Sequence, residues 1–171
     1  MAIKPILTHP NPKLREKSVE IPEEEITGED TKQLITDMKD TIVAYGAQGL
    51  AAVQIGVLKR LFVTVADDED YRVYINPVLS FEYPDKAMNT EGCLSFPGVL
   101  ELVKRYEEVN IEAFNEEGKK FQLSADELSA VAIQHEYDHL DGVLFIDHMS
   151  RLKKKYILKR VSKLRKQGRI E

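Results

Sequence analysis

Two histidines one helical turn apart are the residues of this sequence best suited to chemistry. They stand at positions i and i+4 in the segment His135-Glu136-Tyr137-Asp138-His139. On a helix, side chains at this spacing project from the same face, so two imidazole nitrogens can meet one metal ion. Glu136 between them can face a water on that metal and act as its general base. The segment therefore predicts a hydrolytic metal site.

A catalytic site of this kind needs a third protein ligand and one open position. Cys93 is the better candidate, because Gly92 beside it permits close approach of a ligand or substrate. The longer metalloprotease pattern needs a histidine where this chain has Phe145, and the last predicted helix holds no acid that could replace it. Asp147 and His148 remain as downstream alternatives. A thiolate with two imidazoles around a divalent ion suits attack of water on a carbonyl carbon.

A helix predicted over about 125–140 carries the two histidines. Ser124 and Glu127 have the spacing of a capping box at its start, and Gly142 supplies its stop. Three apolar residues fall on the same face as the histidines: Leu128, Val131 and Ala132. This face is expected to turn inward, with those three residues beside the metal.

The remaining elements predict an α+β fold. An amphipathic helix is expected over 30–45, before Gly46. Short runs of strand composition follow at 60–65, 72–75, 78–83, 100–104, 109–114 and 119–123. The last two flank a hairpin turn, Asn115-Glu116-Glu117-Gly118, and Asp67–Asp70 predicts an acidic turn. Because strands and helices do not alternate, we expect antiparallel-rich sheets packed around the central metal-binding helix, with an N-terminal helix and a C-terminal basic helix.

Size and composition restrict the class of protein. The 171 residues suit a single domain over 1–171, and 43% hydrophobic with 31% charged residues excludes whole-chain disorder. No signal-like apolar segment and no membrane span is recognised, so we expect a cytoplasmic protein without a membrane partner. Cys93 is the single cysteine, which leaves it without an intrachain disulfide partner and favours a reducing compartment.

The net charge of −5 conceals two parts of opposite sign. Residues 149–171 hold ten Lys or Arg and one acid, while residues 1–148 hold 14 basic and 28 acidic residues. A basic helix is predicted over 149–167, with no acidic neighbours in sequence to pair with its lysines. Its expected docking face consists of Leu152, Tyr156, Leu158, Val161 and Leu164. The outer face would attract a polyanion.

Three segments together resemble the signature motifs of bacterial peptide deformylase, in that family's order and spacing. They are Gly49-Leu50-Ala51-Ala52-Val53-Gln54, Glu91-Gly92-Cys93-Leu94-Ser95 and Gln134-His135-Glu136-Tyr137-Asp138-His139-Leu140. The stretch from Ile6 to Arg15 is also similar, so the resemblance covers essentially the whole chain. It implies hydrolysis of the N-formyl group from the N-terminal formyl-methionine of nascent polypeptides, with release of formate.

The resemblance also implies roles for individual residues. It implies one divalent metal ion on Cys93, His135 and His139, with iron(II) in the cell and zinc, nickel or cobalt as alternative occupants. Glu136 would be the general base when metal-bound water attacks the formyl carbon, and then the proton donor to the leaving amine. The side-chain amide of Gln54 and the backbone N–H of Leu94 would stabilise the oxyanion. Substrate-binding positions would be Gln48, Gly49, Glu91, Gly92, Leu128, Val131 and Ala132.

Some positions depart from the family pattern, namely Ala47, Gln48, Asn89 and Leu100. These departures concern side-chain preference and leave the expected chemistry in place. In bacterial deformylases the C-terminal helix is associated with ribosome binding, which implies the same partner for 149–167. Two competing functions are a metallopeptidase, disfavoured by the missing downstream ligand, and a non-enzymatic metal-binding or ribosome-associated factor, which would need neither Glu136 nor Gln54.

Overall fold

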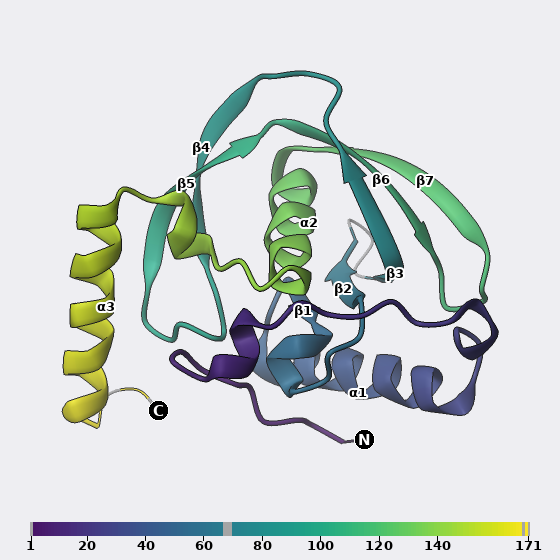
Figure 1. The fold of residues 1–171 in the computed structure, drawn as a ribbon, viewed down its shortest axis with the longest axis horizontal. Coiled ribbons are helices and arrows are strands. Elements are labelled where there is room, and N and C mark those ends of the chain that lie inside the picture. Colours follow the sequence, from purple (N-terminus) through teal and green to yellow (C-terminus); the bar gives the residue numbers. More distant parts are fainter. Residues whose placement is uncertain (1, 67–69, 169, 171) are drawn as a thin grey trace.

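Two antiparallel sheets and three α-helices are present in the computed structural model, which describes residues 2–66, 70–168 and 170 (Figure 1). The helices are α1 (Glu29–Tyr45), α2 (Glu127–Leu140) and α3 (Arg151–Lys166). The strands are β1 (Gly49–Ala51), β2 (Leu61–Val65), β3 (Tyr71–Ser80), β4 (Lys86–Gly92), β5 (Leu100–Tyr106), β6 (Glu108–Phe114) and β7 (Lys120–Asp126). Short 3-10 helices are η1 (Pro12–Arg15), η2 (Glu23–Glu25), η3 (Ala52–Ile55) and η4 (Phe145–His148). The predicted α+β class is confirmed.

The larger sheet has the strand order β1-β2-β3-β6-β7, and every neighbouring pair is antiparallel. Side chains alternate between its faces, so β2 contributes to two cores. Leu61 and Val63 pack in the core that includes α1, and Phe62 packs in the core that includes α2. Because β2 is buried on both faces, its sequence is almost continuously apolar.

Helix α2 occupies the centre of the molecule. Figure 1 shows it between the larger sheet and the two-stranded sheet of β4 and β5, and it contacts strands of both. Ala130, Ile133 and Leu140 pack against the larger sheet. The predicted arrangement of antiparallel sheets around this helix is confirmed, and the helix carries both histidines in its C-terminal half.

The predicted capping box at the start of α2 is wrong. Ser124 lies in β7 and pairs with Asn110 of β6, so the strand continues to Asp126 and the helix begins at Glu127. None of the described side chains caps this helix, and its first residue has a positive φ of 47°. Pairing with β6 outweighs the local capping preference, because it satisfies the backbone along the whole strand. Gly142 follows the helix as predicted, with a φ of 69°.

The two strands predicted over 72–75 and 78–83 are one strand, β3, with a register shift between Ile75 and Val78. Asn76 adopts a φ of 50°, and its side-chain amide exchanges two hydrogen bonds, of 2.9 and 2.7 Å, with the backbone of Ile21. Pro77 follows in the bulge, where its missing N–H costs no ladder bond. Strands β1 and β4 were not predicted, and most of the acidic turn predicted over Asp67–Asp70 lies outside the described residues.

Helix α3 docks through a face that overlaps the predicted one in part: Val161 is buried as expected and Leu158 packs against the same core, while Ile157, which was not predicted, is buried as well. Ile157 and Val161 are its buried residues, whereas Leu152 and Tyr156 are 80% and 66% exposed. The buried pair packs in a core with residues of β5, η4 and the loop after β4: Phe96, Val99, Val103, Phe145 and Ile146. Among the described residues, no helix combines the length and apolar character required to cross a bilayer.

Candidate metal centre and active site

One group of three potential metal ligands forms at the centre of the molecule. Cys93 follows β4 directly, and His135 and His139 come from consecutive turns of α2. Their ligand atoms all lie within 4.8 Å of one another, and Cys93 Sγ lies 3.3 Å from His139 Nε2. The downstream alternatives are not part of this group: Arg15 and Lys154 pair with Asp147, and His148 contacts Asp138.

The geometry and chemistry of this group fit a divalent transition-metal ion. Ligand atoms of a four-coordinate ion with bonds near 2.0–2.3 Å lie roughly 3.3–3.8 Å apart, which these separations allow. Thiolate and imidazole are ligands that zinc and iron accept. Burial lowers the pKa of His139 and favours the neutral form that binds metal, and the positive charges of His135 and Arg105 act in the same direction. Burial would also lower the pKa of His135, but hydrogen bonds to Cys93 and Glu91 act against it and raise the pKa.

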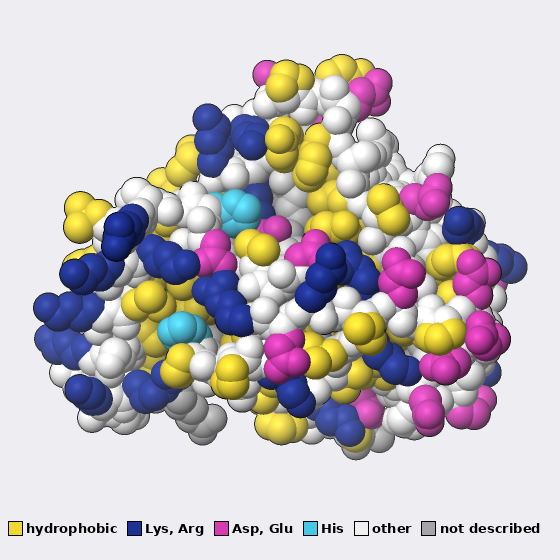
Figure 2. All heavy atoms as spheres, in the orientation of Figure 1, with side chains coloured by type: hydrophobic (Ala, Val, Ile, Leu, Met, Phe, Trp, Pro, Cys, Tyr) yellow, Lys and Arg dark blue, Asp and Glu magenta, His cyan; other side chains and the backbone are white. Residues whose placement is uncertain are grey.

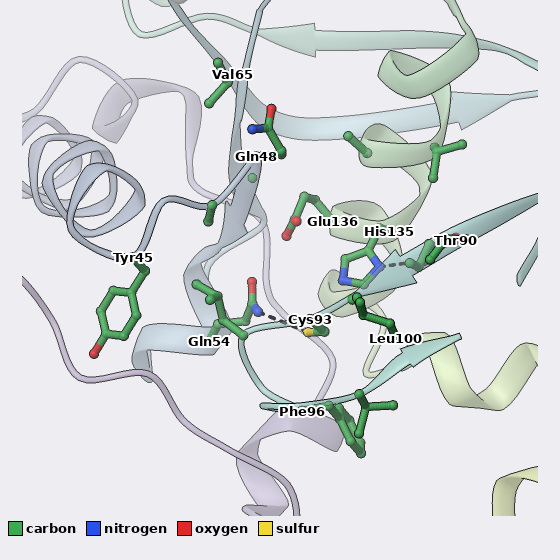
Figure 3. Close-up of a pocket in the computed structure, with 18 of the residues that line it drawn as sticks. Tyr45, Gln48, Gln54, Val65, Thr90, Cys93, Phe96, Leu100, His135 and Glu136 are labelled. Atoms are coloured by element: carbon green, nitrogen blue, oxygen red, sulfur yellow. Dashed lines mark hydrogen bonds and ion pairs between the residues drawn. The ribbon is translucent and has the colours of Figure 1, made fainter. Parts of the chain in front are cut away.

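Glu136 lies beside this group, and one oxygen of its carboxylate has no partner among the described residues. That oxygen, Oε2, is buried. The other oxygen lies against Gly49, where an added Cβ would stand only 2.8 Å from it. Burial raises the pKa of Glu136 to about 7, mainly because the carboxylate form loses water. In Figure 3, Glu136 faces the same space as His135, Gln54 and Cys93.

The side-chain amide of Gln54 is held with its nitrogen toward the metal group. The backbone N–H of Ala51 donates to Gln54 Oε1 at 2.8 Å, which fixes which end of the amide is oxygen. Gln54 Nε2 then donates to the buried hydroxyl of Ser95 at 3.3 Å and lies 3.5 Å from Cys93 Sγ. Figure 3 shows this amide beside Cys93. Leu94 follows Cys93 in the sequence, and it lines the cavity that Gln54, Cys93 and Glu136 also line.

Comparison with known proteins places this geometry in a family. The family model described as polypeptide deformylase matches residues 3–155. A peptide deformylase of Pelagibacter ubique is 44% identical over 169 residues, covering 96% of each chain, and one from Alkalilimnicola ehrlichii is 40% identical, covering 99% of this chain and 95% of its own. The chain belongs to the polypeptide deformylase family. It is therefore a metalloenzyme hydrolase, as the sequence predicted, and the alternative of a non-enzymatic factor is wrong.

Solved deformylase structures have the same fold. The crystal structure of a peptide deformylase from Legionella pneumophila superposes with a TM-score of 0.89 at 36% identity, covering 99% of this chain and 100% of that one. A peptide deformylase from Ehrlichia chaffeensis in complex with actinonin gives a TM-score of 0.88 at 30% identity, covering 95% of this chain and 98% of that one.

The deformylase centre opens into a cavity of about 1100 Å³. Nearly every site residue expected from the sequence lines it: Gln48, Gly49, Gln54, Glu91, Gly92, Cys93, Leu94, Leu128, Val131, Ala132, His135 and Glu136. His139 is more deeply buried, at 1% exposure. Val131 is also buried, whereas Leu128 is 77% exposed and stands at the mouth of the cavity.

Sequence reasoning missed the buried arginine that supports this deformylase centre. Arg105 of β5 donates two hydrogen bonds to Glu91, at 2.6 and 3.0 Å, and a third to Asp138 at 2.6 Å. Glu91 in turn contacts His135 Nδ1 at 2.7 Å, so it holds a proposed ligand besides lining the cavity. Burial alone would raise the pKa of Glu91, but hydrogen bonds from His135 and Arg105 outweigh it and lower the pKa to about 2. Val103 and Arg105 are two positions apart on a strand, so they project to the same face. Because an apolar residue such as Val103 is expected to face inward, this spacing could have predicted that Arg105 is buried.

Proposed function

We propose that this member of the family hydrolyses the N-formyl group of N-formylmethionyl nascent peptides and releases formate. The observation that supports this most strongly is the convergence of Cys93, His135 and His139 with Glu136 and Gln54 at one cavity. A hydrolytic site needs an activated water, a base and donors for an oxyanion, and these five residues can supply all three.

We assign the three metal-ligand roles to Cys93, His135 and His139, with iron(II) as the ion in the cell and zinc, nickel or cobalt as alternative occupants. The ring of His135 would be oriented by Glu91, as carboxylates commonly orient ligating histidines. When bound, the ion supplies a Lewis acid that polarises the formyl oxygen and lowers the pKa of water. Metal analysis of protein prepared without oxygen would identify the ion.

Glu136 has the position of the general base. Its unpartnered Oε2 atom can accept a proton from the attacking water, whose oxygen adds to the formyl carbon. The C–N bond then breaks, and Glu136 returns the proton to the leaving amine nitrogen. Formate and a free amino terminus are the products.

Two donors are assigned to the oxygen that becomes negative during the attack. Gln54 Nε2 is held in place because Ala51 fixes the other end of the amide, so little reorganisation is needed at the moment of reaction. The backbone N–H of Leu94, next to Cys93, is the proposed second donor. A preorganised pair of this kind is worth most in a site from which water is largely excluded.

The substrate peptide is expected to extend the larger sheet. β1 (Gly49–Ala51) is an edge strand, because β2 is its single sheet neighbour in the described part of the chain, and Gly49 lines the cavity. An extended peptide can hydrogen-bond to such an edge as an added strand. The methionine side chain would enter the cavity toward the residues that we assign to its pocket: Gln48, Glu91, Leu128, Val131, Ala132 and His135.

Incubation with formyl-Met-Ala-Ser and with unformylated Met-Ala-Ser tests this function. With iron, nickel or cobalt bound, we expect formate from the first peptide and no change in the second. Cleavage of an internal peptide bond in either peptide would instead identify a peptidase. Absence of any reaction with all three metals would contradict the proposed function.

We further propose that the whole chain is one domain acting in the cytoplasm, and that α3 binds the ribosome. Figure 2 shows Lys and Arg side chains gathered over α3. Two of its lysines do have acidic partners, contrary to the sequence-based expectation: Lys153 pairs with Glu101 at 2.8 Å, and Lys154 pairs with Asp147. Further along the helix, Lys159, Arg160 and Lys163 are exposed and suited to contact RNA phosphates.

Reversing the charge of Lys159, Arg160 and Lys163 to Glu should weaken ribosome binding by about tenfold or more, with the largest loss at low salt. This variant is preferable to truncation at 150, because Ile157 and Val161 are buried in the core and truncation would expose it. The matched control reverses three exposed lysines elsewhere: Lys17, Lys32 and Lys120. Co-sedimentation with ribosomes measures the effect, and equal binding by the α3 variant and unmodified protein would contradict the proposal.

A further inference from the structure

The imidazole of His148 lies outside the metal group but contacts two charged side chains. Its Nε2 atom lies 2.6 Å from Asp138 Oδ2 and 3.0 Å from Arg105 Nη1. Arg105 Nη1 also donates to Asp138 Oδ2 at 2.6 Å, so one atom of each side chain meets at a single point. The three residues come from η4, α2 and β5, and only the tertiary fold brings them together.

The distances determine where the hydrogen of the His148 ring lies. A carboxylate oxygen can only accept, and two acceptor atoms 2.6 Å apart would repel each other. His148 Nε2 therefore carries a hydrogen and donates it to Asp138, an assignment made from the hydrogen-bond network. Arg105 cannot donate to the same nitrogen, so its contact with the ring is a close approach of two donors. Asp138 Oδ2 thus accepts two hydrogen bonds, one from the imidazole and one from the guanidinium.

These hydrogen bonds continue inward to an assigned metal ligand. Arg105 donates to both oxygens of Glu91, and Glu91 Oε2 lies 2.7 Å from His135 Nδ1. The exposed fraction of the side chain rises outward, from 3% for Glu91 and Arg105 to 19% for Asp138 and 34% for His148. We call these four residues the support network. In a buried network each hydrogen bond affects the strength of the next, so a change at the outer end can reach the ligand.

The backbone that carries His148 is held by other residues. Phe145 and Ile146 of the same 3-10 helix are buried in the core, at 1% and 0% exposure. Asp147 forms ion pairs with two basic side chains that do not belong to the support network. Because these contacts fix η4 without the imidazole, a substitution at position 148 can remove a hydrogen bond without displacing the helix.

We propose that His148 is a positioning residue for the metal centre. Its hydrogen bond holds Asp138 against Arg105, and Arg105 in turn keeps Glu91 where it orients His135. The inference rests on the proposed function, because it takes His135 as a metal ligand. Without the imidazole, the half-exposed carboxylate can turn toward solvent, and water can compete for the guanidinium. The ligand ring would then have to be ordered when metal binds, which lowers the affinity.

Three substitutions at this position test the role of the donor. His148→Phe and His148→Ala remove it, and each should weaken Zn²⁺ binding by about three- to tenfold. This loss is smaller than that expected from Arg105→Met, because Asp138 and Arg105 lie between position 148 and Glu91. Glutamine can place an amide N–H close to the position of Nε2, so His148→Gln should bind Zn²⁺ within about twofold of the unmodified protein. Competition with a chelator measures the affinity.

Asp147→Asn is the matched control on the same 3-10 helix. It weakens the ion pairs of η4 outside the support network, so it should lower the free energy of unfolding and leave the Zn²⁺ affinity unchanged. Urea unfolding of the metal-free proteins measures the stability. A purely structural role for His148 would give the same pattern as this control.

A double-mutant cycle shows whether His148 acts through Asp138. In the Asp138→Ala background, His148→Phe should cause no further loss of Zn²⁺ affinity, because the carboxylate that the imidazole holds is absent. An undiminished loss in that background would overturn the inference. Equal affinity of the unmodified protein, His148→Phe and His148→Ala would also overturn it, as would a loss that His148→Gln does not restore. Such results contradict this inference alone, whereas failure of the unmodified protein to bind Zn²⁺ would contradict the metal assignment of the proposed function and this inference with it.

Discussion

Replacing Glu136 with glutamine is expected to lower kcat for formate release by about 10²- to 10⁴-fold while metal content remains unchanged. Glutamine has nearly the same shape and can occupy the position against Gly49, but its amide cannot accept the proton of the attacking water. Because Glu136 is not one of the three assigned ligands, metal binding should persist. Steady-state kinetics with formyl-Met-Ala-Ser and metal analysis of the same sample measure the two effects.

A matched control is available on the same helix. Glu127 is exposed at the start of α2 and does not line the cavity, so Glu127→Gln should have kcat close to that of the unmodified protein. Activity of Glu136→Gln within about tenfold of the unmodified protein would show that another group takes the proton. Loss of metal from Glu136→Gln would show instead that its carboxylate supports a ligand.

Local sequence predicted the parts of the site that one element supplies. The spacing of His135 and His139 requires only a helix, and α2 provides it. Cys93 is 42 positions away from His135, and only the packing of β4 against α2 brings it to the histidines. Its assignment therefore depended on the chemistry that a catalytic site needs, and Gln54 depended entirely on resemblance to a family.

Errors in the predicted elements arose where tertiary contacts outweighed local preference. Ser124 does not cap a helix because it pairs within the β6–β7 ladder. The bulge in β3 depends on the contact of Asn76 with Ile21, 55 residues away in the sequence. For α3, apolar residues occur on a broad part of the helix surface, and periodicity alone did not determine which part docks. Ile157 and Val161 pack in the core that includes Phe96, whereas Leu152 remains exposed to solvent.

Replacing Arg105 with methionine should lower the free energy of unfolding by about 3–5 kcal/mol, because it leaves a buried carboxylate without its partner. The side chains of Glu91 and Arg105 are each only 3% exposed, so water cannot replace the lost hydrogen bonds. Asp138 is affected less, since it is more exposed and retains its contact with His148. Urea unfolding of both proteins at the same free Zn²⁺ concentration measures the change.

The same substitution should also weaken metal binding by about 10- to 100-fold, because Arg105 holds the carboxylate that orients His135. Competition with a chelator measures the affinity. The double variant Arg105→Met with Glu91→Gln separates the two effects: removing the unpaired charge should restore part of the stability, whereas a neutral amide at position 91 should not restore the affinity. If Arg105→Met lowers stability and leaves the metal affinity unchanged, Arg105 supports the fold and does not position the ligand. If neither the free energy of unfolding nor the metal affinity changes, the ion pair between Arg105 and Glu91 stabilises the protein no more than methionine at position 105 does.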